Sequence, residues 1–318
     1  MQLLATPAAW RSSLLACVVG LAWHVPAGAG QPNREALPAS GIFFDDFSYA
    51  DVAALAKGGW IQRGKPGHPG LEGAQWGPQT VQLAADDDVP GNRVLRLRAR
   101  TDGTPAGTFQ AQLCHARKYL EGTYAARVRF SDAPSQGPDG DVVIQSFYLV
   151  SPLRFDFDPL FSEIDWEYLP NGGWGDARAR LYGNAWQTVQ LNPWNAYNQA
   201  HQEFRSMAGW HTLLMQVALG KTRMFIDGLQ VAEHGGRTYP VAPMAIHFNL
   251  WFAPGGLLPD ARALRAYQLD VDWVFHAKNR VFSPAEVDQA VAGMRSTHIS
   301  AVDSVAPATP ELPSPCDI

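Results

Sequence analysis

Six consecutive residues, from Glu163 to Tyr168, alternate strictly between acidic and large apolar side chains. In a β-strand the side chains of residues i, i+2 and i+4 lie on one face of the strand. Glu163, Asp165 and Glu167 therefore share one face, and the three apolar residues share the other. The pattern predicts a strand that packs its apolar face into a core and leaves three acids in a row on a concave or solvent-facing surface.

The chain from Gly41 to Val281 is typical of many short strands separated by turns. Asp227-Gly228 has the composition of a compact hairpin turn. Many strands with few helices favour an all-β, two-sheet sandwich, which we expect over residues 41–282. The clearest strands are expected near residues 43–47, 80–83, 94–99, 124–130, 142–148, 211–217, 222–226, 245–252 and 267–275.

One helix is predicted, close to the C-terminus. Ser283 and Glu286 have the spacing of a capping box, and an apolar-periodic stretch follows, so we expect a short helix over residues 283–295. Residues 296–318 contain four prolines and little apolar sequence. We expect this tail to be disordered unless Cys316 ties it to the rest of the protein.

The first residues have the layout of a secretory signal peptide. Arg11 precedes an apolar stretch from Leu14 to Val25, and Ala27-Gly28-Ala29 supplies a small-residue cleavage site. We therefore expect a signal peptide at residues 1–29, a linker at 30–40, and secretion to an extracellular or periplasmic location. A lipoprotein signal ending at Cys17 is the weaker alternative, since almost no apolar sequence precedes it. No contact with a membrane is expected after cleavage.

Net charge and cysteine content limit the binding partners and the disulfides that this protein can have. The formal net charge is −5 and no basic block occurs, so nucleic-acid binding has no electrostatic support. Cys114 and Cys316 are the cysteines that remain after the predicted cleavage. They permit one disulfide in an oxidising compartment, and two unpaired thiols fit the sequence equally well. A monomer is expected.

Three adjacent carboxylates repel one another and raise one another's proton affinity. Glycoside hydrolysis uses this effect, because it needs one ionised carboxylate and one protonated carboxylic acid at the same site. The outer two Cα atoms of such a strand lie about 13 Å apart, whereas retaining carboxylates lie about 5–5.5 Å apart and inverting ones about 6.5–9.5 Å. Spacing in sequence therefore leaves the stereochemistry open. A calcium site and a solvated acidic face are the competing interpretations.

The residues around this strand resemble glycoside hydrolase family 16, the laminarinase, lichenase and agarase group. Glu163-Ile-Asp165-Trp-Glu167 is similar to the family's Glu-x-Asp-x-Glu strand. Other segments resemble family motifs in the same order along the chain: Tyr119–Arg127, Trp210–Thr212, Met224–Gly228, Pro243-Met244, Phe248–Trp251 and Leu269–Val274. The resemblance covers roughly residues 41–282 and implies a concanavalin A-like jelly roll.

The resemblance also implies roles for individual residues. Glu163 would be the nucleophile, Glu167 the general acid/base, and Asp165 a partner that hydrogen-bonds and tunes Glu163. Substrate contacts would come from Asn184, Trp186, Asn249 and Trp251, with Trp174 and Trp194 as weaker candidates in loops. Core packing explains each of these tryptophans equally well. Arg178 and Arg180 would meet an acidic glycan or, more simply, pair with acids of the protein.

The sequence thus predicts a secreted, endo-acting, retaining hydrolase of a β-linked polysaccharide. A lectin-like binding protein and a transglycosylase are alternatives on the same fold, since fold does not determine function. A polysaccharide lyase would need a Tyr or His base together with a basic group, and the sequence contains no matching cluster. No cofactor is expected, and the sequence does not decide whether a structural calcium ion is bound. The family often has a Trp-Pro-Ala-Phe-Trp stretch before the catalytic strand, whereas residues 142–150 contain no Trp, so substrate preference cannot be transferred.

Overall fold

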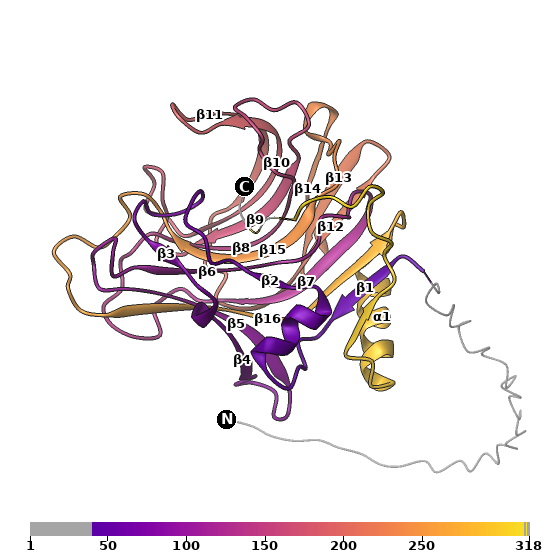
Figure 1. Ribbon diagram of the computed structural model, residues 1–318, viewed down its shortest axis with the longest axis horizontal. Helices are drawn as coiled ribbons and strands as arrows, with labels where there is room; N and C mark the ends of the chain where they lie inside the picture. The colour runs from indigo at the N-terminus through magenta and orange to yellow at the C-terminus, as the bar shows by residue number, and fades with distance from the viewer. Residues whose placement is uncertain (1–39, 315, 317–318) are drawn as a thin grey trace, which may run out of the picture. The chain divides into compact units, whose positions relative to one another are not determined.

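The computed structural model describes residues 40–314 and Cys316, and Figure 1 shows its ribbon. The predicted signal peptide and all of the predicted linker except residue 40 lie outside the described residues. Within the described part, no helix is long and apolar enough to cross a membrane.

Two curved β-sheets form the protein, as predicted (Figure 1). One sheet, which we call the cleft sheet, contains in spatial order β11 (Asn195–Glu203), β10 (Arg180–Gln190), β9 (Glu163–Leu169), β8 (Val143–Val150), β15 (Ala245–Phe252), β6 (Phe109–Cys114) and β2 (Ile61–Gln62). Its named pairings are antiparallel. This antiparallel jelly roll is the predicted all-β class.

The second sheet, the outer sheet, packs against the first. It contains in order β14 (Leu229–Gly235), β13 (Lys221–Ile226), β12 (Gly209–Ala218), β7 (Gly122–Phe130) and β16 (Arg265–Lys278). Beyond β16 lie β5 (Arg93–Thr101) with β4 (Val81–Ala85), and β1 (Ile42–Asp45) with β17 (Ala301–Asp303). The sheets meet at β6, which also pairs with β5 and with β3 (Gln75–Trp76). Short 3₁₀ turns occupy Val52–Gly58, Pro78–Thr80 and Gly236–Thr238.

The main core lies between the two sheets and explains the orientation of β9. Ile164, Trp166 and Tyr168 are fully buried there, against residues of the outer sheet such as Met215 and Val274. Because successive strand residues face opposite ways, this burial turns the three acids of β9 to the other face of the cleft sheet. The predicted division of the strand into an apolar and an acidic face is therefore correct.

A second cluster covers the far side of the outer sheet. Helix α1 (Pro284–Ser296) packs Val287, Val291 and Met294 onto Phe44 and Trp273. Ser283 caps the helix by accepting from the Glu286 backbone NH, and the Glu286 carboxylate accepts from the Ser283 NH. The predicted helix and its capping box are thus confirmed, and Figure 1 shows the helix beside β1.

The C-terminal tail is ordered in the residues described, and Cys316 ties it to the rest of the protein. Ala301–Asp303 forms β17, which pairs with β1, and Val305 joins the main core. Cys316 forms a disulfide with Cys114 on β6. The prolines remove backbone donors, but side chains supply other anchors: Ser314 Oγ accepts a 2.7 Å hydrogen bond from the backbone NH of Arg117. The covalent tie is the condition under which the sequence allowed an ordered tail.

Candidate active site

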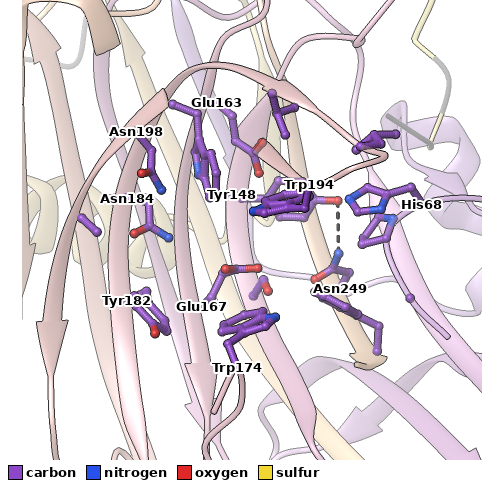
Figure 2. A pocket seen from close by; sticks show the side chains of 18 of the residues that line it. His68, Tyr148, Glu163, Glu167, Trp174, Tyr182, Asn184, Trp194, Asn198 and Asn249 are labelled. Atoms are coloured by element: carbon purple, nitrogen blue, oxygen red, sulfur yellow. Dashed lines mark hydrogen bonds between the residues drawn. The ribbon is translucent and has the colours of Figure 1, made fainter. Parts of the chain in front are cut away.

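A cleft of about 640 Å³ lies on the concave face of the cleft sheet. Glu163 and Glu167 line it, and Figure 2 shows both carboxylates pointing into it from β9. The predicted substrate contacts Asn184, Trp186, Asn249, Trp251 and Trp174 all line the same cleft, as does Trp194. The structure therefore brings together every predicted site residue of β9, β10 and β15.

Asp165 lies between the two glutamates and is 1% exposed. Its carboxylate accepts from Asn184 Nδ2 at 2.7 Å and from Trp186 Nε1, both on the neighbouring strand β10. Burial raises the pKa of Asp165 to about 7, against the opposing effect of these two donors. The hydrogen bonds of Asp165 thus go to β10, whereas the resemblance implied a bond to Glu163.

Glu163 and Glu167 are half-buried, and within residues 40–314 and 316 neither carboxylate has a hydrogen-bond partner in the protein. Burial raises the pKa of Glu163 well above its usual value, and the charges of Asp165 and Glu167 raise it further. Burial also raises the pKa of Glu167, with the charge of Asp165 as the second cause. The three acids therefore hold their protons more strongly than isolated carboxylates do.

Aromatic side chains surround the acids. Trp174, in the loop after β9, is 57% exposed, and Trp194, at the tip of the β10–β11 hairpin, is 58% exposed. Trp194 stacks with His68 at 6.2 Å between ring centroids. Trp251 is instead largely buried against Ile144 and presents only part of its ring to the cleft. Exposed flat rings in a cleft suit the C–H faces of sugars, because they remove apolar surface from water.

Arg178 and Arg180 do not act as free cations in the cleft. Both form ion pairs with Asp176, at 2.7 Å and 3.1 Å respectively. Arg180 NH1 also donates to the hydroxyl of Tyr182, which does line the cleft. The simpler of the two sequence interpretations, pairing with acids of the protein, is therefore the one observed.

Several residues that line the cleft were not predicted from the sequence. His68 comes from the loop after β2, Tyr148 and Ser146 from β8, Tyr182 from β10 and Asn198 from β11. Tyr148 and Tyr182 could have been found, since they alternate in phase with residues already placed on the cleft face: Tyr148 pairs with Asp165, and Tyr182 with Glu167. His68 carries no such pattern in the sequence.

The calcium interpretation of the acidic strand receives no geometric support. Across the described ranges, no group of three or more His, Cys, Asp or Glu side chains is arranged to hold a metal ion, and this includes the acids of β9. Both carboxylate oxygens of Asp165 already accept a hydrogen bond from a nitrogen donor.

A jelly roll with an acidic strand on the floor of an aromatic cleft is typical of one class of protein, the carbohydrate-active enzymes of this fold. The profile of the family described as "Glycosyl hydrolases family 16" matches residues 74–274, most of the sandwich. The chain belongs to this family and is a glycoside hydrolase. It matches none of the curated proteins.

Solved structures share the fold at low sequence identity. A mixed linkage glucan enzyme from Bacteroides ovatus, in complex with the product G4G4G3G, is 16% identical, covers 73% of this chain and 98% of its own, and has a TM-score of 0.57. A β-glucanase from Bacillus licheniformis is 17% identical over 76% and 100% of the two chains, with a TM-score of 0.55. LamAcat from Zobellia galactanivorans is 15% identical over 76% and 98%, with a TM-score of 0.52.

Proposed function

We propose that this protein is a secreted, endo-acting hydrolase of a β-linked polysaccharide that works with retention of configuration. Glu163 attacks the anomeric carbon, and Glu167 donates a proton to the departing glycosidic oxygen. Glu167 then removes a proton from the water that releases the sugar from Glu163. Asp165 acts through its charge on both glutamates. The assignment of the two glutamates follows the family resemblance.

The observation that carries the proposal is the placement of the three acids in the cleft together with their raised pKa values. They share one face of β9, line or underlie the cleft, and have raised pKa values because of burial and mutual repulsion. The double-displacement reaction needs one carboxylate ionised and another protonated at the same pH. Glu163 and Glu167 also lack hydrogen bonds to the protein among the described residues, so both carboxylates are available to a substrate.

Endo action is supported by the exposed tryptophans. Figure 2 shows Trp174 on the side of Glu167 and Trp194 towards the side of Glu163. Sugar units can therefore stack on either side of the reacting unit, as an internal cut in a polymer requires. A protein adapted to a single terminal sugar would have little use for exposed rings at both places.

Secretion is supported by the disulfide and by the predicted signal peptide. The Cys114–Cys316 bond joins residues 202 positions apart. Such a bond is stable in an oxidising compartment and rare in the cytosol. Secretion also matches a polymeric substrate, which a cell meets outside its membrane.

The experiment tests hydrolysis and assigns the nucleophile. The secreted protein and Glu163→Gln are incubated with β-1,3-1,4-glucan, laminarin and β-galactans, because the fold is shared with structures of glucan-cleaving enzymes. We expect wild-type protein to release reducing ends rapidly with a steep fall in viscosity. We expect Glu163→Gln to lose at least about 10³-fold in kcat.

Proton NMR of the first product distinguishes the stereochemistry, since retention gives the β-anomer before mutarotation. Unchanged polymer degradation by Glu163→Gln would remove Glu163 from the mechanism. An α-anomer as the first product would overturn the retaining assignment while leaving hydrolysis intact.

A further inference from the structure

Tyr148 occupies a central position in the cleft and has no role in the reaction as described above. It lies on β8 directly across from Asp165, so its side chain stands on the floor between the rows of Glu163 and Glu167. Figure 2 shows it beneath Trp194, beside Asn249. The side chain is 3% exposed but contributes to the cleft lining.

The hydroxyl of Tyr148 already accepts two hydrogen bonds. Gln112 Nε2 donates to it at 2.9 Å, and Asn249 Nδ2 donates at 3.2 Å. A phenol oxygen has two acceptor positions and one proton to give. Among residues 40–314 and 316, no acceptor for that proton is found.

The orientation of Gln112 decides that Tyr148 must be an acceptor there. Arg63 NH1 donates to Gln112 Oε1 at 2.9 Å, and a guanidinium has donors only. The amide oxygen of Gln112 therefore faces Arg63, and its nitrogen faces Tyr148. The same nitrogen lies 2.9 Å from His247 Nδ1, which must then accept and carry its proton on Nε2. The amide of Gln112 is thus fixed by Arg63. With the nitrogen of Asn249 also turned to the hydroxyl, the Tyr148 proton points away from both amides, and Asn249 Oδ1 has no partner among the described residues.

The hydroxyl also keeps its proton. Burial and the nearby charges of Glu163 and Glu167 raise the pKa of Tyr148 well above its ordinary value. Tyr148 is therefore a neutral donor at neutral pH. A buried donor without an acceptor is unfavourable, so the free protein holds a group that a ligand can satisfy.

We propose that Tyr148 donates its hydroxyl proton to one sugar oxygen of the unit bound over Asp165, and so selects substrates with an unsubstituted oxygen at that position. The proposal rests on the proposed function, because it uses the same cleft and the same reacting unit. Gln112 and Asn249 are positioning residues, since they act through Tyr148 by occupying its acceptor sites. Substrates with a bulky or methylated group at this oxygen would leave the phenol donor without a partner.

The test compares Tyr148→Phe with a matched control. The variant keeps the ring and removes one oxygen, and we expect kcat/KM on β-1,3-1,4-glucan to fall about 10- to 100-fold. The control is Tyr267→Phe, on the outer sheet, where another fully buried tyrosine hydroxyl donates to Asp141 at 3.0 Å. We expect Tyr267→Phe to lower the melting temperature and to leave kcat/KM unchanged.

A binding measurement separates recognition from a merely structural role. Affinity for β-1,3-1,4-linked glucotetraose is measured calorimetrically with Glu163→Gln and with the double variant Glu163→Gln/Tyr148→Phe, at a temperature where both are folded. The same pair is then titrated with monodeoxy analogues of the tetrasaccharide. We expect one of the analogues to bind Glu163→Gln more weakly than the parent tetrasaccharide does. The same analogue should bind the double variant no more weakly than the parent tetrasaccharide does.

Two outcomes would overturn the proposal. In one, Tyr148→Phe leaves both kcat/KM and affinity within about twofold of their reference values. In the other, every analogue loses the same affinity in both proteins, so that no sugar oxygen is coupled to Tyr148. Full activity of Glu163→Gln would instead contradict the proposed function, and the affinity comparison would still report on Tyr148.

Discussion

The molecule contains two strands in which acids alternate with apolar residues, one on each sheet. On β9 of the cleft sheet the acids are Glu163, Asp165 and Glu167, and on β16 of the outer sheet they are Asp270 and Asp272. Both strands bury apolar residues in the same core, Ile164 and Trp166 on β9 and Leu269 and Val271 on β16. The acids of β16 face away from that core, towards helix α1 and the arginines of the outer sheet.

The two strands differ in what surrounds the carboxylates. Arg96 binds Asp270 through two hydrogen bonds of 2.8 Å. Asp272 accepts from Arg295 at 2.7 Å and from Arg127 at 3.1 Å. No arginine or lysine forms an ion pair with the β9 acids within the described residues. The acids of β16 are neutralised by cationic partners, whereas those of β9 have no cation paired with them, and their two glutamates are available for chemistry.

The largest expected effect belongs to the general acid. We expect Glu167→Gln to lose about 10²- to 10⁴-fold in kcat on polysaccharide, since no group then protonates the leaving oxygen. The loss should shrink on an aryl β-glycoside, because a phenolate of low pKa departs without a proton. Parallel kinetics on both substrates check this, with Glu163→Gln as the variant that should lose activity on both. Equal losses of Glu167→Gln on both substrates would contradict the assigned role.

The next effect concerns stability and belongs to β16. Asp272 is fully buried, and Asp272→Asn leaves two arginines with a weaker partner. We expect a loss of about 2–3 kcal/mol, at the low end for a broken buried pair because both arginines are about one-third exposed. The melting temperature should fall by about 4–12 °C, while kcat/KM at 25 °C stays unchanged. A change in kcat/KM without a change in melting temperature would reverse the distinction between the strands.

The sequence predicted both alternating strands but not the difference between them. Alternation follows from the two-residue period of a strand and needs no knowledge of neighbours. The cations that pair with β16 come from β5, β7 and helix α1, with Arg96 lying 174 positions from Asp270. Such partners become visible only once the chain has folded. The acidic strand of the cleft was recognised because the ordered motifs around it resembled a family.

Other parts of the site had no readable pattern. Strand β11 was not predicted, because its residues from Asn195 to Glu203 are mostly polar and exposed on both faces. Its hairpin with β10 nevertheless carries Trp194 over the cleft (Figure 2). Tyr148 has the correct phase on β8, but no other feature of the sequence distinguishes it from the other strand aromatics. Its role as a donor depends on the orientation of Gln112, which in turn depends on Arg63.

The smallest expected effect concerns the pH dependence of Asp165→Asn, the one acid of β9 that has hydrogen-bond donors. Its charge raises the pKa values of Glu163 and Glu167, so removing that charge should lower both. The acid limb of kcat/KM reports ionisation of Glu163, and the alkaline limb reports loss of the proton from Glu167. Both limbs should therefore move to lower pH.

Both shifts have one origin, because the charge of Asp165 contributes to the raised pKa of Glu163 and to that of Glu167. Profiles of kcat/KM against pH, with Asp270→Asn as the control that should match wild type, measure both limbs. Limbs that stay in place, or that move to higher pH, would show that Asp165 acts on the glutamates through its two hydrogen bonds to β10 and not through its charge.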